Sequence, residues 1–163
     1  MNPAEIAAVH AVMAALKDAE PGTEIKLPDG SRAHIQPTEP GLRAVQVEQR
    51  DGRSWRLRLF DPSTTRPSSY PADIPFIPDS KAAITDGSDG HAMATWETAA
   101  VDPVVEQLIG QTTSGGWEAV PEDPALQRLP LPMKTRQFRR GERTRVIMSM
   151  SAAGSGVVSM FDS

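Results

Sequence analysis

The sequence predicts an α+β protein in which two helices pack on one face of an antiparallel β-sheet. Two stretches carry apolar residues at the three- and four-residue spacing of a helix, and many short stretches alternate apolar and polar residues, as strands do. The 15 prolines and 12 glycines divide the chain into short elements. With 163 residues the chain has the size of one domain. A helix followed by about four strands in each part also fits two similar halves.

The first helix is expected to begin at Asn2 and to end near Ala19, before Pro21 and Gly22. Asn2 can accept a hydrogen bond from the free N–H groups of the first turn, and Pro3 suits the first helical position because it lacks an N–H. The predicted buried stripe consists of Ile6, Val9, Met13 and Leu16.

Four strands should follow in two pairs. The alternating stretches are residues 24–27, 32–36, 45–48 and 55–59. Residues 28–31 form the first turn and Asp51-Gly52 the second, since Asp-Gly favours the positive φ values of a tight hairpin. Apolar side chains share one face and charged side chains the other, which is typical of a sheet with one face in water.

Residues 62–80 are predicted to be a proline-rich connector. Proline removes donors from a β-ladder and restrains φ, so this segment should be extended. It separates residues 1–61, a helix with a four-stranded meander, from residues 81–163, a hairpin, a helix and an antiparallel meander. One compact domain overall is the alternative.

The second part should begin with strands at 81–85 and 91–98. A helix from Asp102 to Ser114 is expected, because Asp102-Pro103 repeats the start signal and Gly115-Gly116 can supply the left-handed residue at its end. Its predicted buried face holds Val104, Val105, Leu108 and Ile109. A short strand at 117–120 and an irregular loop at 121–133 follow.

The chain is predicted to end in a hairpin and one further strand. Residues 136–140 and 143–151 pair over Gly141-Glu142, and Ser155-Gly156 turns into a strand at 157–161. Alternation places Thr144, Val146, Met148 and Met150 on one face of the hairpin. The arginines of this hairpin should then point outward.

The second half has a helix that ends at Gly116-Trp117, then Phe138, and then a strand at 143–150. In these features it resembles small uncharacterised bacterial α/β domains. The resemblance covers about 60 residues of the second half, and it implies a fold but no activity.

Motifs for catalysis or metal binding are not found in the sequence. The absence of cysteine excludes disulfides, thiolate catalysis and cysteine-based zinc or iron–sulfur sites. His10, His34 and His91 have no partner at metal-ligand spacing. The oxygen-rich loop at 86–89 lacks the ligand spacing of an EF-hand, so a plain turn is the better interpretation. We therefore expect no catalytic residue, no metal site and no cofactor.

Positive charge is concentrated between Lys134 and Arg145. This segment contains six cationic residues and one acidic residue, Glu142, so its net charge is +5. Because the whole chain has a net charge of −4, the rest of it carries −9. Such a segment can contact an acidic protein, the chain's own acidic body or the phosphates of a nucleic acid. The residues predicted to bind a partner are Lys134, Arg136, Phe138, Arg139, Arg140, Arg143 and Arg145.

These features favour a non-enzymatic protein–protein interaction module or accessory subunit of a larger bacterial assembly, which contacts partners through the basic hairpin and the proline-rich arms. One alternative is a small-molecule-binding or enzymatic domain whose pocket holds Trp55, Trp96, Trp117 and a histidine. Another is nucleic-acid binding by the hairpin, against which the acidic composition argues. Neither a leader peptide nor a membrane-spanning stretch is recognised, so a cytoplasmic location is the default expectation.

Overall fold

Ten strands and two helices are formed by the residues that the computed structural model describes, which are 3–16, 19–87, 91–122, 124, 133–152 and 154–163. The chain divides into unit 1, residues 1–60 and 83–90, and unit 2, residues 61–82 and 91–163. Every strand pair with a defined register is antiparallel, which confirms the antiparallel sheet. The expectation that both helices share one face, and the predicted domain boundaries, stay predictions.

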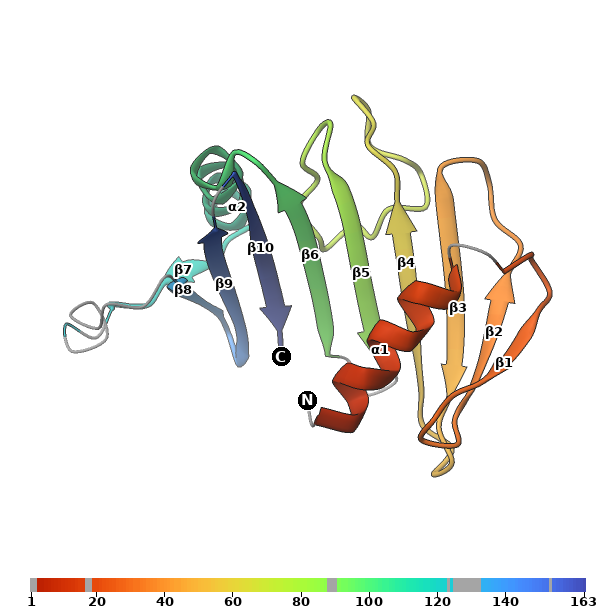
Figure 1. Ribbon diagram of the computed structural model, residues 1–163. Coiled ribbons are helices and arrows are strands. Elements are labelled where there is room, and N and C mark those ends of the chain that lie inside the picture. The colour runs from red at the N-terminus through yellow and green to blue at the C-terminus, as the bar shows by residue number, and fades with distance from the viewer. Residues whose placement is uncertain (1–2, 17–18, 88–90, 123, 125–132, 153) are drawn as a thin grey trace. The chain divides into compact units, whose positions relative to one another are not determined.

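Unit 1 contains a helix and a meander of strands (Figure 1). Its elements are α1 (Pro3–Leu16), β1 (Glu24–Lys26), β2 (Arg32–Gln36), β3 (Leu42–Glu48) and β4 (Ser54–Phe60), followed in strand order by β5 (Lys81–Gly87). The β3–β4 turn lies at Asp51-Gly52, as predicted. Gly52 has a φ of 86°, and the Asp51 carboxylate accepts a hydrogen bond from the N–H of Arg53 (3.0 Å).

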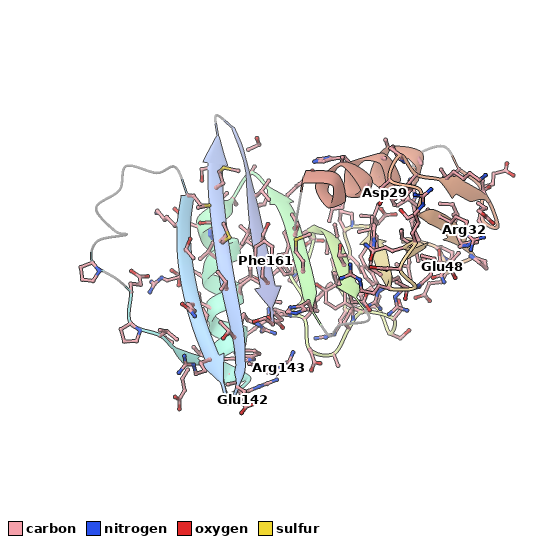
Figure 2. The ribbon with its side chains drawn as sticks, turned by 90° about the horizontal axis from the view of Figure 1, so that it is seen from below. Asp29, Arg32, Glu48, Glu142, Arg143 and Phe161 are labelled. Carbon is pink, nitrogen blue, oxygen red and sulfur yellow. The ribbon has the colours of Figure 1, made fainter. Side chains whose placement is uncertain are left out.

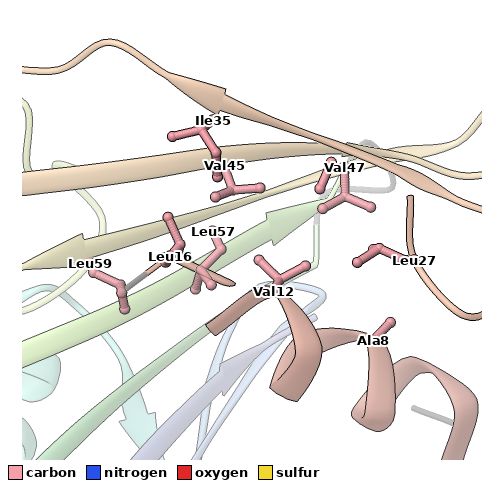
Figure 3. Packing of buried hydrophobic residues seen from close by; sticks show 10 residues of the cluster. Ala8, Val12, Leu16, Leu27, Ile35, Val45, Val47, Leu57 and Leu59 are labelled. Carbon is pink, nitrogen blue, oxygen red and sulfur yellow. The ribbon is translucent and has the colours of Figure 1, made fainter. Parts of the chain in front are cut away.

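The core of unit 1 lies between α1 and the apolar face of its strands. Figure 3 shows Val12 and Leu16 of the helix directed toward Val45 and Leu57 of the strands. All four side chains are at most 3% exposed. Burying a valine or leucine stabilises the fold by about 1.5–3 kcal/mol, so this contact accounts for the position of the helix.

The buried stripe of α1 follows a spacing of four residues, from Ala8 through Val12 to Leu16. The prediction is correct for Leu16, whereas Met13 is only half-buried. The side chains of Ile6 and Val9 lie outside the described residues. The stripe differs from the prediction because an α-helix has 3.6 residues per turn. Residues four positions apart are therefore closer in direction around the helix axis than residues three positions apart.

Unit 2 contains the second helix and five strands. Its elements are β6 (Ala92–Thr98), α2 (Val101–Ser114), β7 (Glu118–Ala119), β8 (Met133–Arg140), β9 (Arg143–Ala152) and β10 (Ser155–Asp162). The strand order is β6-β10-β9-β8-β7, and α2 packs against β9 and β10. The buried face of α2 consists of Val101, Val104, Leu108 and Thr112. Val104 and Leu108 agree with the prediction, whereas Val105 and Ile109 are half-buried.

The start of α2 differs from the prediction. Asp102 is not the N-cap: Ala100 occupies that position and no side chain caps the helix. Asp102 lies inside the first turn, where its negative charge complements the positive end of the helix dipole. Val101 can open the helix because its side chain packs over β10, directly above Gly156; a Cβ at Gly156 would approach Val101 Cγ2 to 2.1 Å.

The β9–β10 turn also differs from the prediction. Ser155 and Gly156 belong to β10, and Ser155 pairs with Ala152. The turn therefore lies between Ala152 and Ser155, and Gly154 within it has a φ of 79°. Because the turn determines the register, its position decides which residues of β9 pair with which residues of β10.

Some predictions concern segments outside the described residues. Asn2, Ser88, Asp89 and, within the loop at 121–133, residues 123 and 125–132 belong to this group. No helix in the described ranges has both the length and the apolar character needed to cross a membrane.

Candidate functional site

The C-terminal end of α2 positions Trp117. Gly116 has a left-handed φ of 83°, its N–H donates to Thr113 O (3.1 Å), and the N–H of Trp117 donates to Thr112 O (3.3 Å). These two bonds form a Schellman motif, which satisfies the last carbonyl groups of a helix. The prediction that Gly115-Gly116 supplies the left-handed residue at the end of this helix is thus confirmed. The motif ends the helix and delivers the Trp117 side chain into a buried position, 4% exposed.

Three arginines of the β8–β9 hairpin surround the Trp117 ring. The Cζ atoms of Arg145, Arg140 and Arg143 lie 4.4, 4.6 and 5.7 Å from the ring centroid. A cation over an indole face contributes about 0.5–2 kcal/mol. Arg140 Nη1 also donates to the carbonyl oxygen of Gly115 (3.0 Å), at the negative end of the helix dipole. The hairpin is thereby fastened to the end of α2.

Arg145 is buried, so the prediction that the hairpin arginines point outward is wrong at this position. Its Nε and Nη2 atoms lie 2.7 Å from the two carboxylate oxygens of Asp162. Nη1 donates to Thr112 Oγ1 (3.4 Å), and Nη2 donates to the carbonyl oxygen of Asp73 (2.9 Å). Arg145 and Asp162 are 2% and 3% exposed. The charge is tolerated because the carboxylate neutralises it and the remaining bonds satisfy its donors.

The proline-rich segment contributes a second aromatic residue with an arginine beside it. Arg66 Cζ lies 5.2 Å from the Tyr70 ring centroid, and Arg66 Nη2 donates to the carbonyl oxygens of Pro71 and Ile74. The Tyr70 hydroxyl donates to Pro75 O (2.7 Å). Burial raises the pKa of Tyr70 to about 12, so its side chain is neutral at physiological pH.

These parts of unit 2 line a partly open pocket of about 150 Å³. Its lining includes Arg66, Asp73, Gln111, Trp117, Arg140 and Arg145. Gln111 is fixed by the main chain of Phe76, whose N–H donates to Oε1 (3.1 Å) and whose carbonyl oxygen accepts from Nε2 (2.8 Å). Of the three tryptophans considered for a pocket, Trp117 alone lines this one, and no histidine does. Sequence reasoning did not identify this cluster of arginines.

The residues predicted to bind a partner lie on β8 and β9, and five of them are exposed. These are Lys134, Arg136, Arg139, Arg140 and Arg143. Phe138 is 2% exposed and, like Arg145, it is directed into the protein. Arg136 pairs with Glu122 (2.9 Å), whereas Arg143 lies 3.8 Å from Asp162, near Glu142 at the end of the hairpin (Figure 2). Binding by the five exposed cations stays a prediction.

The sheet face of unit 2 that α2 does not cover carries a set of apolar side chains. It carries Met93, Met133, Val146, Met148, Met150, Val157 and Phe161 on β6, β8, β9 and β10. Met150 pairs with Met133 on one side and Val157 on the other, and Phe161 pairs with Val146 and Met93. These two apolar rows are separated by a row in which Met148 pairs with Thr135 and Ser159. Met133, Met150 and Phe161 are 38%, 51% and 36% exposed, and Figure 2 locates Phe161 on β10. We call these seven residues the open face.

The sequence predicts that Val146, Met148 and Met150 of the open face lie on one face of the hairpin, but it does not predict that this face is exposed. Val146, Met148 and Met150 are the most apolar alternating set of β9, which favours burial. The structure buries the other set, with Ile147 1% and Ser149 7% exposed. A sequence signal existed in the repeated methionines, which occur often on adaptable binding surfaces.

Metal ligation is not supported by the described part of the chain, where no three His, Asp or Glu residues gather as a metal site would require. Asp86, from the loop considered for calcium, instead pairs with Arg56 (3.1 Å) and Arg58 (3.4 Å) in unit 1. Burial lowers the pKa of Arg58, an effect that Asp86 opposes. Asp86 is therefore a structural counter-ion.

Comparison of the sequence with protein-family models gave no match, and comparisons with curated proteins and with solved structures gave none either. The resemblance to small bacterial α/β domains stays a prediction. Functional inference for this chain depends on the geometry of the open face, the hairpin and the pocket.

Proposed function

We propose that the protein is a non-enzymatic interaction module that binds an acidic, partly apolar segment of another protein on the open face of unit 2. The observation that supports this proposal is the exposure of Met133, Met150 and Phe161 on adjoining strands. Exposed apolar surface costs about 25 cal/mol per Å², and contiguous patches of it commonly mark interaction sites.

Methionine makes the open face suitable for a protein segment. Four of the seven methionines of the chain lie on it: Met93, Met133, Met148 and Met150. Their side chains are unbranched and polarizable, so they adapt to apolar groups of different shape. The backbone below them is held by the ladders from β6 to β8. A regular sheet with adaptable side chains fits a partner segment better than a reacting substrate.

The charge of β8 favours an acidic partner. Within the described ranges, Arg139 takes part in no ion pair; Lys134 and Arg140 take part in none either, but they alternate to the opposite face of β8. By alternation Arg139 lies on the same face as Met133, and segment 134–145 has a net charge of +5. An acidic segment would gain apolar burial and attraction to Arg139 together.

The proline-rich segment is not part of the proposed surface. Its apolar residues Tyr70, Ile74 and Ile77 are 5%, 3% and 2% exposed because they pack within the protein. The proposal therefore assigns partner binding to the open face and to Arg139 of the basic hairpin instead of the proline-rich arms.

A pair of labelled synthetic peptides tests the proposal. One peptide alternates phenylalanine and aspartate, and the other has lysine in place of each aspartate. Fluorescence anisotropy with the full chain should show binding of the acidic peptide and not of the basic one. Met150→Asp should weaken this binding about tenfold or more, because it places a carboxylate in the apolar contact next to acidic residues of the peptide.

Gln107→Asp is the matched control, since it adds the same charge at an exposed position of α2. It should leave peptide affinity unchanged. Equal binding of both peptides, or acidic-peptide binding that survives Met150→Asp, would overturn the proposal. Self-association that Met150→Asp abolishes would assign the open face to a second copy of the chain. Preference for a single-stranded oligonucleotide would assign the hairpin to nucleic acid, and both outcomes also contradict the proposal.

A further inference from the structure

We infer that the pocket beside Trp117 is a binding site for a small oxyanion, a carboxylate or phosphate group held by Arg66 and Arg140. Both arginines line the pocket. It lies on the α2 side of the unit 2 sheet, because Arg140 alternates to the same face as the buried Phe138. The inference is therefore independent of the proposed function, which uses the opposite face.

Arg66 and Arg140 are oriented by groups that do not neutralise them. Arg66 donates to the carbonyl oxygens of Pro71 and Ile74, and Arg140 donates to that of Gly115. Neither arginine forms an ion pair with the residues that the structure describes. Carbonyl dipoles fix the positions of the two guanidinium groups but leave their full charges uncompensated.

The remaining charged groups of the lining do not cancel this excess. Arg145 is neutralised by Asp162 in a bidentate pair. Asp73 is the acidic residue of the lining, and it is exposed while its carbonyl oxygen accepts a hydrogen bond from Arg145. The pocket lining therefore has two uncompensated cations and one carboxylate. A partly enclosed site of this sign attracts anions, since water screens it less than it screens an open surface.

Each of the two arginines keeps donors for a ligand. A guanidinium group has five N–H bonds, of which Arg66 uses those on Nη2 and Arg140 one on Nη1 in contacts with described residues. Their planar forks match carboxylate and phosphate oxygens. Stacking on Tyr70 and Trp117 restrains both side chains, so less conformational entropy is lost on binding.

The volume of the pocket limits the size of the ligand. A space of about 150 Å³ holds several water molecules, and therefore also one oxyanion group. Gln111 is fixed to the main chain of Phe76, so this wall of the pocket is held in place. The ligand is a small molecule, or the terminal group of a larger one.

Nuclear magnetic resonance titration of the full chain tests the inference. Inorganic phosphate and acetate are added separately, with sodium chloride at matched ionic strength as the control. Phosphate, acetate or both should saturably shift the indole N–H signal of Trp117 and the Nε–H signals of Arg66 and Arg140, and chloride should not. Comparing the phosphate titration with the acetate titration distinguishes a phosphate site from a carboxylate site.

Arg66→Gln and Arg140→Gln should each weaken the binding about tenfold or more, because each removes a charge-assisted contact. Arg140→Lys should bind with intermediate affinity, since it keeps the charge and loses the fork. Arg32→Gln, an exposed cation of unit 1, and Met150→Asp on the open face should leave it unchanged. Equal shifts with chloride, or titrations that the Arg66 and Arg140 variants do not alter while their unfolding midpoints stay near wild type, would overturn the inference.

Discussion

Arg145 and Asp162 are register partners on β9 and β10, and the guanidinium group of one bonds both carboxylate oxygens of the other at 2.7 Å. The pair is almost inaccessible to water. Removing two charges from water costs several kcal/mol, so such a pair adds little net stability, but it penalises any arrangement that separates the two groups. It thereby selects one register of the β9–β10 hairpin, because a slip by one residue would leave both charges unpaired.

Asp162→Asn should destabilise the protein by about 3–5 kcal/mol, because the substitution leaves the Arg145 charge buried without a counter-ion. Urea unfolding of the full chain measures this loss. Adding Arg145→Met to the same chain should recover part of it, since the double variant has no buried charge.

Glu48→Gln provides the matched control in unit 1. Glu48 and Arg32 are also cross-strand partners, 3.5 Å apart, but their side chains are 51% and 56% exposed. Loss of this exposed pair should cost less than about 1 kcal/mol. A cost for Asp162→Asn as small as that of Glu48→Gln would show that Arg145 finds water or another partner.

Gly116→Ala should destabilise the protein by about 1–2 kcal/mol, whereas Gly115→Ala should change stability by less than about 0.5 kcal/mol. Gly116 has a φ of 83°, which alanine adopts only with strain, and Gly115 has a φ of −81°. A Cβ at Gly115 would meet no atom closer than 3.4 Å. Thermal unfolding of the two variants checks this difference, and equal midpoints would contradict the role of the Schellman motif.

Tyr70 should make the protein less stable at alkaline pH. Burial raises its pKa from 10.0 to about 12, so the unfolded chain loses the proton first. The stability contributed by the neutral phenol is complete below pH 10.0 and is lost as the pH rises to about 12, by about 2–3 kcal/mol in total. Because the chain has one tyrosine, the absorbance of tyrosinate reports this pKa directly.

Tyr70→Phe is the control for this titration. At neutral pH it should cost about 1 kcal/mol, since the bond to Pro75 O is lost. As the pH passes 10.0 the difference from wild type should shrink and then reverse, because phenylalanine does not titrate. Parallel pH–stability curves for the two proteins, from urea unfolding, would show that Tyr70 ionises as easily in the folded state as in the unfolded chain.

Much of the fold could be predicted because its turns are encoded by adjacent residues. Asp51-Gly52 and Gly141-Glu142 lie at the predicted hairpin turns, and Gly52 and Gly141 have φ values of 86° and 62°. Gly116 ends α2 for the same local reason. Only glycine adopts such φ values without strain, so these positions are visible in the sequence alone.

The buried face of β9 could not be predicted from alternation. Arg145 is the most polar residue of the buried set, and its burial depends on Asp162, 17 positions later. A hairpin turn assigned between Ala152 and Ser155 would have paired the two residues, but the turn was predicted at Ser155-Gly156. Long-range charge compensation overrode the apolar pattern.

The candidate site was predictable only in part. Five exposed cations of the hairpin follow from the charge pattern of residues 134–145. The pocket does not, because it needs Arg66 and Asp73 to meet the end of α2 from a segment without regular secondary structure. Neither spacing nor periodicity in the sequence relates those residues.

The assignment of the two faces of β9 predicts opposite effects for substitutions at Met150 and Ile147. Met150 is 51% exposed on the open face, so Met150→Gln should change the free energy of unfolding by less than about 0.5 kcal/mol. Ile147 is 1% exposed beneath α2, so Ile147→Ala should cost about 2–5 kcal/mol through lost burial and the cavity left behind. Urea unfolding of both variants measures the two values. If Met150→Gln were the costlier change, the open face would be covered in solution and could not receive a partner.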